Sequence, residues 1–373
     1  MATEELAMAG VYHDRLERAQ EQLRQQEVDM LLVGPSADLV YLIGFEAHES
    51  ERLNLLLLPR EGDPVMVMPV LESPLLRDRG AALELNITTW TETQSPTELV
   101  AQLAGDMTGK TVAVSDTLWS MFLLRLQRDM TGARWIGAGG VMRPLRVIKD
   151  GREIELMQEV SRRTDDAWTE FLTQPLSGQT EAQAMARLAG LMADRRLGEG
   201  FGICASGPNS ASPHHQAGDR VIQPGDAVLF DFGGTLEGYN SDITRTVHIG
   251  PPSDEFVKVY NIVLEANQAV LDAVRPGVPC EALDEVARNI ISNAGYGDFF
   301  IHRVGHGLGL EIHEEPYLVE GNSAPLESGM IFSDEPGIYL EGRFGIRIED
   351  AVRCTDTGGE RLNEASRELM ILE

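Results

Sequence analysis

The sequence is poor in cysteine, in basic side chains and in long apolar runs. Its three cysteines, among 373 residues, form no C-x-x-C pair, so neither a disulfide framework nor a thiolate zinc site is expected. Apolar runs such as 55–58 are far shorter than the roughly 20 residues that span a membrane. This cysteine usage fits a reducing cytoplasm, which is the expected location. The first ten residues contain Glu4 and Glu5 and no basic stretch, so we expect no signal peptide.

Basic residues are outnumbered by acidic ones, 31 to 59, which gives a net charge of −28. This charge repels phosphate groups, so neither nucleic acid nor an anionic membrane is expected as a partner. The excess is uneven: residues 1–149 hold 14 basic and 21 acidic side chains, and residues 150–373 hold 17 and 38. A solvated surface explains most of the excess, and carboxylates gathered around cations are the alternative.

The first 140 residues alternate between strand-like apolar runs and helix-like segments, which is typical of an α/β domain. Strands are predicted at 30–33, 40–44, 53–58, 65–68 and 111–115, and helices at 13–26, 95–103 and 117–129. A turn-rich junction follows, from Gly139 to Pro144, and a new amphipathic helix begins near Asp150. We therefore place one domain at 1–145 and a second at 146–373.

The second domain is predicted to contain two pairs of helices, each followed by a β-rich segment. The helices are expected at 151–174, 180–197, 254–274 and 281–294, and the β-rich segments at 200–249 and 300–353. Thr180 and Gln183 have the spacing of a capping box. This repeated order indicates an α+β domain whose two related halves surround one central sheet.

The motifs HExxH, GxSxG and GxxxxGK[ST] are all absent. Asp231 follows the apolar stretch 227–230, where a carboxylate is costly unless it is paired or bound to a metal ion. Glycines after Asp231 can turn the chain and bring Asp242 back on a facing strand. The two carboxylates then reach one cation site, unless both only cap a turn.

Three histidines, His302, His306 and His313, lie within twelve residues among several glycines. Histidine supplies metal ligands and proton-transfer groups near neutral pH, and His302 and His306 would face the same way on a regular strand. Glu335 follows an apolar strand and precedes a Pro-Gly turn, and Glu349 occupies the next strand.

Two aspartates, two glutamates and one histidine form a donor set that suits Mn²⁺ or Co²⁺ better than structural zinc. Four carboxylates around one centre repel each other unless about two divalent cations compensate. Two metal ions roughly 3.5–4 Å apart are a known hydrolytic device that produces hydroxide at neutral pH.

From about residue 145 to the C-terminus, the sequence resembles the M24 "pita-bread" metallopeptidases, which include methionine aminopeptidase, Xaa-Pro aminopeptidase and Xaa-Pro dipeptidase (prolidase). The N-terminal region resembles the α/β domain of the Xaa-Pro branch and of creatinase. The resemblance implies a creatinase-like α/β domain at 1–145 and an α+β pita-bread catalytic domain at 146–373.

The resemblance also implies the metal ligands. Asp231 corresponds to a ligand of one metal ion, and His306 and Glu335 correspond to ligands of the other. Asp242 and Glu349 correspond to the two bridging carboxylates. Two divalent ions are implied, with Mn²⁺ expected and Co²⁺ or Zn²⁺ as alternatives.

Further roles follow from the same resemblance. His214 matches a histidine near the scissile bond, and His313 matches one that contacts the substrate carbonyl. Glu335 is also the implied proton carrier between the attacking water and the leaving nitrogen. His302 and Arg347 match residues beside the substrate and the metals.

The implied activity is hydrolysis of the Xaa-Pro bond in proline-containing di- or oligopeptides by a homodimer. A dipeptidase is favoured over an aminopeptidase that acts on longer peptides. Tyr317, an expected substrate-binding residue, stands where some prolidases have an arginine expected to bind the dipeptide carboxylate, so Arg347 or another basic group is an alternative for that role. We also consider creatinase-like hydrolysis of another C–N amide bond and a non-catalytic binding protein, but such proteins lack metal ligands that this sequence retains.

Overall fold

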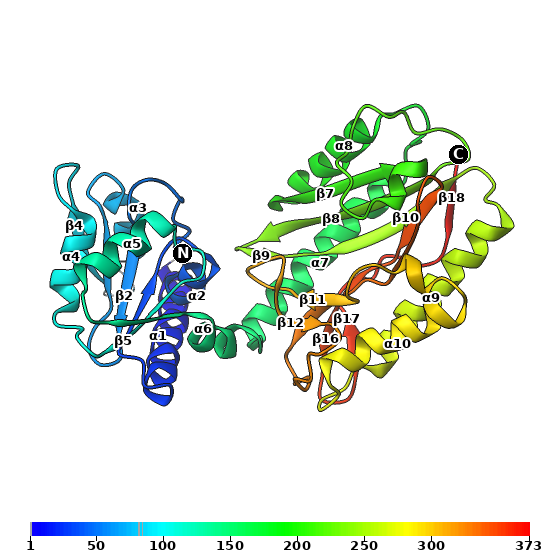
Figure 1. Cartoon of the computed structure of the whole chain (residues 1–373). Coiled ribbons are helices and arrows are strands. Elements are labelled where there is room, and N and C mark those ends of the chain that lie inside the picture. Colours follow the sequence, from blue (N-terminus) through cyan, green and yellow to red (C-terminus); the bar gives the residue numbers. More distant parts are fainter. Residues whose placement is uncertain (1, 81–82, 84) are drawn as a thin grey trace. The chain divides into compact units, whose positions relative to one another are not determined.

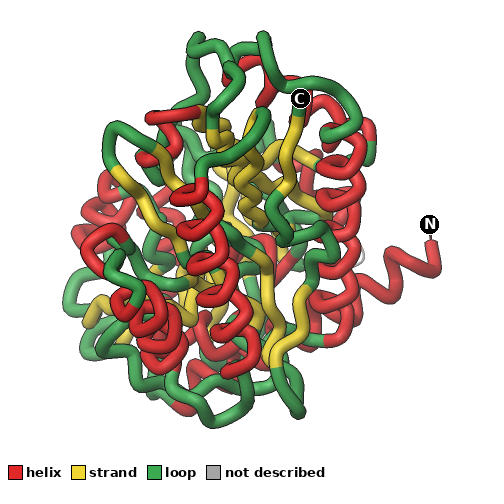
Figure 2. The backbone as a smooth tube through the Cα atoms, turned by 90° about the vertical axis from the view of Figure 1, so that its right-hand side faces the viewer, coloured by secondary structure: helices red, strands yellow, loops and turns green. Residues whose placement is uncertain are grey.

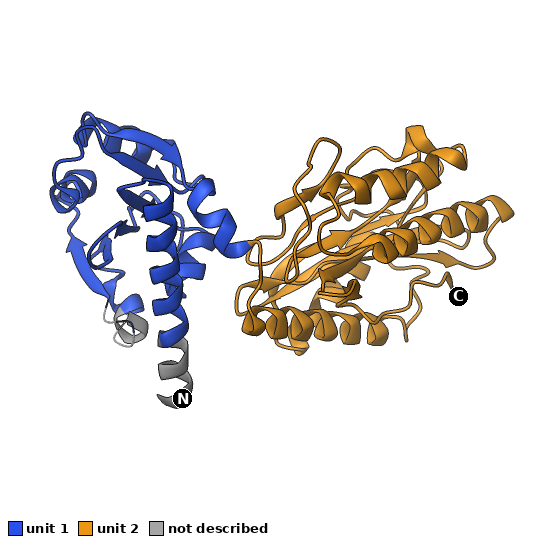
Figure 3. Cartoon of the chain, turned by 90° about the horizontal axis from the view of Figure 1, so that it is seen from below, with its two compact units in different colours: residues 1–146 blue, residues 147–373 orange. Residues whose placement is uncertain are grey.

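The computed structural model in Figure 1 describes residues 2–80, 83 and 85–373. Its helices and strands are traced along the backbone in Figure 2. The chain divides into two compact units, residues 1–146 and 147–373, which are coloured separately in Figure 3. In the described part of the chain, no helix has the length and apolar character needed to cross a membrane.

The first unit is built around a six-stranded sheet with strand order β4-β3-β2-β1-β5-β6. Its elements are α1 (Ala2–Gln25), β1 (Met30–Val33), α2 (Ala37–Ile43), β2 (Leu55–Pro59), β3 (Val65–Pro69), α3 (Ser73–Gly80), β4 (Asn86–Trp90), α4 (Pro96–Ala104), β5 (Thr111–Val114), α5 (Ser120–Asp129), β6 (Arg134–Gly137) and α6 (Gly139–Arg146). Strand β1 runs parallel to β5 and antiparallel to β2, and all four of its residues are buried. The predicted α/β architecture of this region is therefore confirmed.

Two local predictions in this unit are wrong. Of residues 40–44, predicted as a strand, 40–43 belong to α2 and Gly44 ends this helix at φ 65°. The Ser36 side chain caps its start by accepting from Leu39 N (3.4 Å). A short apolar run fits a strand or a buried helix equally well, so the caps decide the outcome. The predicted turn from Gly139 to Pro144 is part of helix α6, which buries one apolar face.

The second unit repeats a helix pair followed by strands. Its elements are α7 (Gly151–Phe171), α8 (Glu181–Asp194), β7 (Gly198–Ser206), η1 (Gly207–Ala211), β8 (Ala227–Leu236), β9 (Tyr239–Asn240), β10 (Ile243–Ile249), α9 (Asp254–Ala273), α10 (Cys280–Asn293), η2 (Gly297–Phe299), β11 (Gly305–Gly307), β12 (Glu314–Leu318), β13 (Ile331–Asp334), β14 (Gly337–Leu340), β15 (Phe344–Arg347), β16 (Asp350–Cys354), β17 (Gly359–Arg361) and β18 (Met370–Leu372). Capping boxes at Asp150 and Thr180 begin α7 and α8, so the predicted box at Thr180 is confirmed.

The strands of this unit form two five-stranded sheets and a hairpin rather than one central sheet. One sheet has the order β18-β10-β8-β7 with β9 beside β8, and the other has the order β12-β11-β13-β16-β17. A single isolated bridge, between Thr244 and Glu349, joins them, because the chain leaves regular strand geometry between β15 and β16. The junction of the two sheets is where the acidic residues of interest converge.

Each sheet is covered by its own helix pair. Trp168 of α7 packs against Phe230 and Phe232 of β8, with ring centroids 5.3 and 5.4 Å apart. Helices α9 and α10 bury Val263 and Leu283 in a core shared with Phe332 of β13. Burial of such side chains contributes roughly 1.5–3 kcal/mol each, so each sheet is held firmly against its own helix pair.

Candidate metal centre

Three side chains at the sheet junction offer metal-ligand atoms close together. One atom each from Asp242, His306 and Glu349 lies within 4.8 Å of the others, and all three side chains are buried. His306 Nε2 is 3.3 Å from Glu335 Oε1 and 3.7 Å from Asp242 Oδ2. The structure thus brings together residues that are more than a hundred positions apart in the sequence.

The two aspartates are positioned by β8 and β10, neighbouring strands of the sheet with the order β18-β10-β8-β7. Asp231 lies within β8, opposite Thr244 of β10, and does not end the strand as the sequence suggested. Strand β8 continues to Leu236 because glycines let the chain approach its neighbours closely. The chain then reverses through Glu237 and Gly238, both at positive φ, and Asp242 immediately precedes β10.

The histidine is placed by β11, whose two flanking glycines have no room for a side chain. A Cβ atom at Gly305 would lie 1.9 Å from the Ser333 carbonyl oxygen, and one at Gly307 would lie 2.2 Å from the Glu315 carbonyl oxygen. The His306 backbone N–H donates to Ser333 Oγ at 3.0 Å. This close packing fixes the ring with Nε2 toward the carboxylates.

Glu335 directly follows β13, as predicted. Glu349 lies between β15 and β16, with only an isolated bridge to Thr244, so the prediction that it occupies a strand is wrong. The backbone N–H of Glu335 donates to the Val304 carbonyl at 2.8 Å, and its Oε1 accepts a 3.2 Å hydrogen bond from Ser333 Oγ. Glu349 Oε2 accepts a 2.5 Å hydrogen bond from Thr244 Oγ1. Both carboxylates are held by backbone or hydroxyl donors that leave further oxygen lone pairs available.

The electrostatics of the cluster call for additional positive charge. Burial raises the pKa of Asp231, Asp242 and Glu349, and repulsion from neighbouring carboxylates adds to the shift. Burial acts in the same direction on Glu335, but its hydrogen bond to His306 and the nearby charges of His306, His302 and Arg347 together outweigh burial and lower the pKa. Carboxylates that resist ionisation together are the environment that bound divalent cations stabilise.

One atom of the cluster has no partner among the described residues. Asp231 Oδ1 is buried without a hydrogen bond, whereas Oδ2 lies 2.5 Å from Arg347 Nη2. A buried, unsatisfied carboxylate oxygen is costly and is normally compensated by a bound group. The hard oxygen donors and single imidazole therefore fit divalent metal ions, with Asp231, Asp242, His306, Glu335 and Glu349 as the available ligands.

Arg347 is the positive charge that the fold itself supplies to the cluster. Its Nη1 donates to Tyr339 Oη at 2.7 Å and its Nε donates to Thr244 Oγ1 at 3.1 Å. The side chain is almost entirely buried, and together with Asp231 Oδ2 these contacts occupy all three guanidinium nitrogens. Four of its five N–H groups therefore have acceptors within the protein, counting a 3.5 Å contact from Nη2 to the Pro213 carbonyl oxygen, so Arg347 mainly serves the carboxylate cluster.

Four residues of the sequence-based site surround a cavity of about 1000 Å³ beside the cluster. Its wall includes His214, His302, His313 and Arg347 together with the five possible ligands. Tyr317, predicted to bind substrate, does not line this cavity, because it lies on β12 with its ring beneath Arg303. Apolar side chains complete the wall: Phe201, Ile203, Ile301, Ile312 and Val319.

His302 is held in one tautomer by the protein. Its Nδ1 lies 2.7 Å from the Arg303 carbonyl oxygen and its Nε2 lies 2.8 Å from Tyr339 Oη. Burial lowers the pKa of His302, so Nδ1–H donates to the carbonyl and Nε2 accepts from the tyrosine. It precedes β11, so the expectation that it shares a strand face with His306 is wrong.

His313 is a neutral donor at physiological pH. Burial, followed by the nearby His306 and Arg303, lowers its pKa to about 4. Its ring packs edge-on against His306 with centroids 4.1 Å apart. A neutral imidazole in the cavity wall can donate one hydrogen bond to an oxygen on which negative charge develops.

The loop that carries His214 is fastened by Glu181, a residue that sequence reasoning missed. Glu181 is fully buried, and its Oε1 accepts from Ser206 N, Ser206 Oγ and Asn209 Nδ2 at 2.7–3.0 Å. Its Oε2 lies 2.8 Å from His215 Nε2. The signal in the sequence was weak, because an acidic residue in the first turn of a helix is ordinary.

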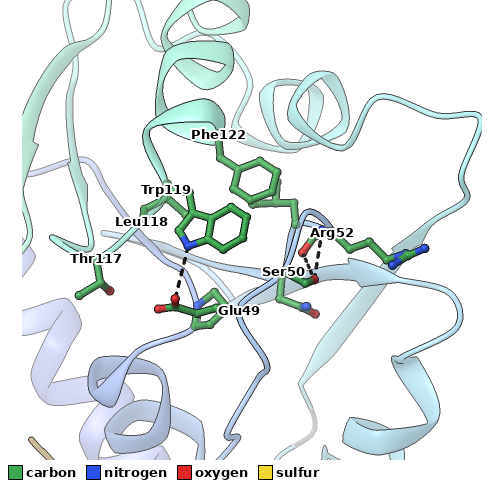
Figure 4. Close-up of a pocket in the computed structure, with 10 residues that line it drawn as sticks. Glu49, Ser50, Arg52, Thr117, Leu118, Trp119 and Phe122 are labelled. Atoms are coloured by element: carbon green, nitrogen blue, oxygen red, sulfur yellow. Dashed lines mark hydrogen bonds between the residues drawn. The ribbon is translucent and has the colours of Figure 1, made fainter.

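The first unit contains a far smaller cavity beside Trp119, with room for about one water molecule at 10 Å³. Trp119 stacks on Phe122 with centroids 6.2 Å apart, and its Nε1 donates to Glu49 Oε2 at 3.3 Å (Figure 4). The residues that line this cavity include one carboxylate, Glu49, and no histidine or cysteine, so they do not form a metal-binding set.

With this geometry established, comparison with known proteins identifies the class. Residues 155–356 match the model of metallopeptidase family M24, and residues 15–148 match that of the creatinase/prolidase N-terminal domain. The chain therefore belongs to the M24 metallopeptidases, with a creatinase-type N-terminal domain and a pita-bread catalytic domain, and it is a metal-dependent peptidase. The predicted family, fold and enzyme class are confirmed.

The similarity to known proteins extends over nearly the whole chain. The probable dipeptidase PepE of Mycobacterium tuberculosis is 39% identical over 367 residues, which cover 98% of this chain and 97% of that protein. The crystal structure of dipeptidase PepE from Mycobacterium ulcerans has a TM-score of 0.93 and 40% identity, with 98% of each chain covered. Recombinant prolidase from Thermococcus sibiricus has a TM-score of 0.92 and 37% identity, with 97% of this chain and 99% of that chain covered.

Proposed function

We propose that this enzyme is an Xaa-Pro dipeptidase that binds two divalent metal ions between its two sheets. The carrying observation is the cluster of four carboxylates and His306, in which a buried oxygen of Asp231 has no partner among the described residues. Asp231, Asp242, His306, Glu335 and Glu349 would hold the ions. Their number is proposed from charge, since one divalent ion leaves the carboxylates of the cluster undercompensated.

Divalent ions bound here would supply Lewis-acid polarisation of a carbonyl and a lowered pKa for water. The residues of the chain account for the remaining requirements. His313, neutral and lodged in the wall, donates a hydrogen bond to the carbonyl oxygen as it gains negative charge. His214, on the exposed loop after η1, lies on the same cavity and is proposed to orient the peptide near the scissile bond.

Glu335 is proposed to move the proton. The nitrogen of an Xaa-Pro bond has no hydrogen, so the departing proline must receive a proton. Glu335 lies in the cavity wall, and its lowered pKa keeps it ionised at neutral pH, so its carboxylate is proposed to take the proton of the attacking water. It then delivers that proton to the leaving nitrogen.

Dipeptides containing proline are proposed as substrates because similar proteins are named dipeptidase and prolidase. The apolar wall formed by Phe201, Ile203, Ile301, Ile312 and Val319 suits a proline ring. Mn²⁺ is the proposed ion on the basis of the oxygen-rich donor set, with Co²⁺ or Zn²⁺ as alternatives. A cytoplasmic homodimer is proposed from the cysteine content and the family resemblance.

The alternative is an Xaa-Pro aminopeptidase, which the volume of the cavity, about 1000 Å³, would admit. The two activities are distinguished by incubating the Mn²⁺-loaded enzyme with Ala-Pro and with Ala-Pro-Ala and measuring released alanine by chromatography. Preferential cleavage of Ala-Pro supports a dipeptidase, and preferential cleavage of Ala-Pro-Ala supports an aminopeptidase. Failure to cleave either peptide while metal is bound would show that the Xaa-Pro assignment is wrong.

A further inference from the structure

Arg303 is one of two arginines in the cavity wall. Unlike Arg347, it makes no side-chain hydrogen bond to another described residue. It is half-buried between His302 and Val304. No carboxylate in the described part of the chain forms an ion pair with it. The other arginine, Arg347, donates from all three nitrogens to Asp231, Tyr339 and Thr244.

The orientation of Arg303 is set by an aromatic ring rather than by an acid. Its guanidinium carbon lies 4.3 Å from the centroid of the Tyr317 ring. Asn322 Nδ2 in turn donates to the Tyr317 carbonyl oxygen at 2.7 Å, which anchors that end of β12. A stacked guanidinium keeps its N–H groups in the plane of the fork, where they can meet a carboxylate through two parallel hydrogen bonds.

The surroundings of Arg303 suit the C-terminal end of an Xaa-Pro dipeptide. Apolar residues Ile301, Ile312 and Val319 belong to the same cavity wall, beside a cation. In an Xaa-Pro dipeptide, an apolar pyrrolidine ring carries a carboxylate. In a longer peptide the same position is a neutral amide, which gains much less from a guanidinium.

We propose that Arg303 binds the C-terminal carboxylate of the substrate and thereby determines the preference for dipeptides. This inference rests on the proposed Xaa-Pro activity. Tyr317 is the positioning residue for Arg303 and acts without touching the peptide. Arg347, considered for the same task on sequence grounds, is less suitable because each of its three nitrogens already donates to a residue of the protein and its charge is paired with Asp231.

The test compares Ala-Pro with its amide, Ala-Pro-NH₂, in the Mn²⁺-loaded wild type and in Arg303→Met. Wild type is expected to prefer Ala-Pro, and Arg303→Met is expected to lose about 10- to 100-fold in kcat/KM for Ala-Pro, mainly through KM. Its activity on Ala-Pro-NH₂ should stay within about 2-fold, because no carboxylate is lost. Arg303→Lys should recover part of the preference, and Tyr317→Leu should reduce it by roughly 2- to 5-fold.

A matched control is Arg343→Met, which removes an exposed arginine paired with Glu255 outside the cavity and should change neither substrate. If Arg303→Met keeps the preference for Ala-Pro, or loses both substrates equally while folded, Arg303 does not read the carboxylate and the inference is overturned. If wild type prefers the amide, the inference about Arg303 is also overturned, but the proposed cleavage of Xaa-Pro bonds is still supported. If wild type cleaves neither compound, the proposed function itself fails.

Discussion

Arg347 and Asp231 form a buried ion pair, with Nη2 2.5 Å from Oδ2, and the second oxygen of Asp231 has no partner among the described residues. The pair joins β15 to β8 and so links the hairpin to the first sheet. One oxygen of Asp231 is thus held by the protein, and the other is available to a cation. The pair therefore positions Asp231, a proposed ligand, and leaves one of its oxygens available.

Substitution of Arg347 should lower the stability of the protein. Arg347→Met leaves Asp231 as an uncompensated buried charge, and the metal-free protein is expected to lose about 3–5 kcal/mol of unfolding free energy. Urea denaturation at neutral pH measures the change. Arg343→Met, which breaks an exposed pair, should cost about 1 kcal/mol or less. Equal losses in the two variants would refute the structural role of Arg347.

Metal binding should stabilise the fold, because the ligands come from both sheets. At a metal concentration one hundred times the Kd, a single bound ion contributes about 2.7 kcal/mol to the unfolding free energy. Thermal denaturation with and without Mn²⁺ should therefore show a clear increase in Tm that EDTA reverses. Asp242→Asn should abolish most of this increase, whereas Asp219→Asn, on the loop preceding β8, should leave it unchanged. A Tm independent of metal would contradict the placement of the site between the sheets.

The metal-free cluster should also make stability depend on pH in a specific direction. Burial raises the folded-state pKa of Asp242 and Glu349 above the unfolded value, so the folded state binds protons more tightly than the unfolded chain. This contribution is fully present below the unfolded pKa, near 4, and is lost as the pH rises through the folded pKa. In metal-free protein, Asp242→Asn should gain stability relative to wild type as the pH rises from 5 to 8. A constant difference over that range would show that Asp242 ionises normally.

Glu181 should control activity through the loop that carries His214. Glu181→Ala removes an acceptor shared by Ser206, Asn209 and His215, so buried donors are left unsatisfied and the loop is released. We expect kcat/KM for Ala-Pro to fall by about 10- to 100-fold, while Mn²⁺ affinity, measured by calorimetry, is unchanged because no metal ligand moves.

Two comparisons separate this positioning role from general instability. Glu181→Gln preserves the shape and one acceptor oxygen, so it should recover part of the activity. Glu170→Ala, which removes an exposed partner of Arg195, should behave as wild type. If Glu181→Ala is destabilised but fully active, Glu181 supports the fold alone.

The sequence predicted the site where charged residues occur at positions whose local pattern calls for apolar ones. Carboxylates at 231, 335 and 349 stand within or next to apolar stretches of sequence, and that conflict predicted a cation site before any geometry was known. The helix beginning at Gly151 was predicted from apolar residues at helical spacing, and the helix beginning at Glu181 from the capping-box spacing of Thr180 and Gln183. Such local signals do not depend on the rest of the fold.

The remaining features depend on contacts between distant segments. Arg303 is distinguished by the ring of Tyr317 beneath it, and Glu181 by donors from 25 to 37 positions away. Neither residue breaks a local pattern, so neither was predicted. The strand expected at 40–44 failed for a different reason, since its apolar run was too short to show a period and only its capping residues determined a helix.

The most direct test of the central claim is anomalous diffraction, recorded at the manganese edge, from crystals of the enzyme grown with Mn²⁺. We predict two anomalous peaks about 4 Å apart or less, both contacting Asp242 and Glu349, with Asp231 on one and His306 on the other. A single peak, or peaks away from these side chains in a crystal that holds manganese, would contradict the proposed two-metal peptidase.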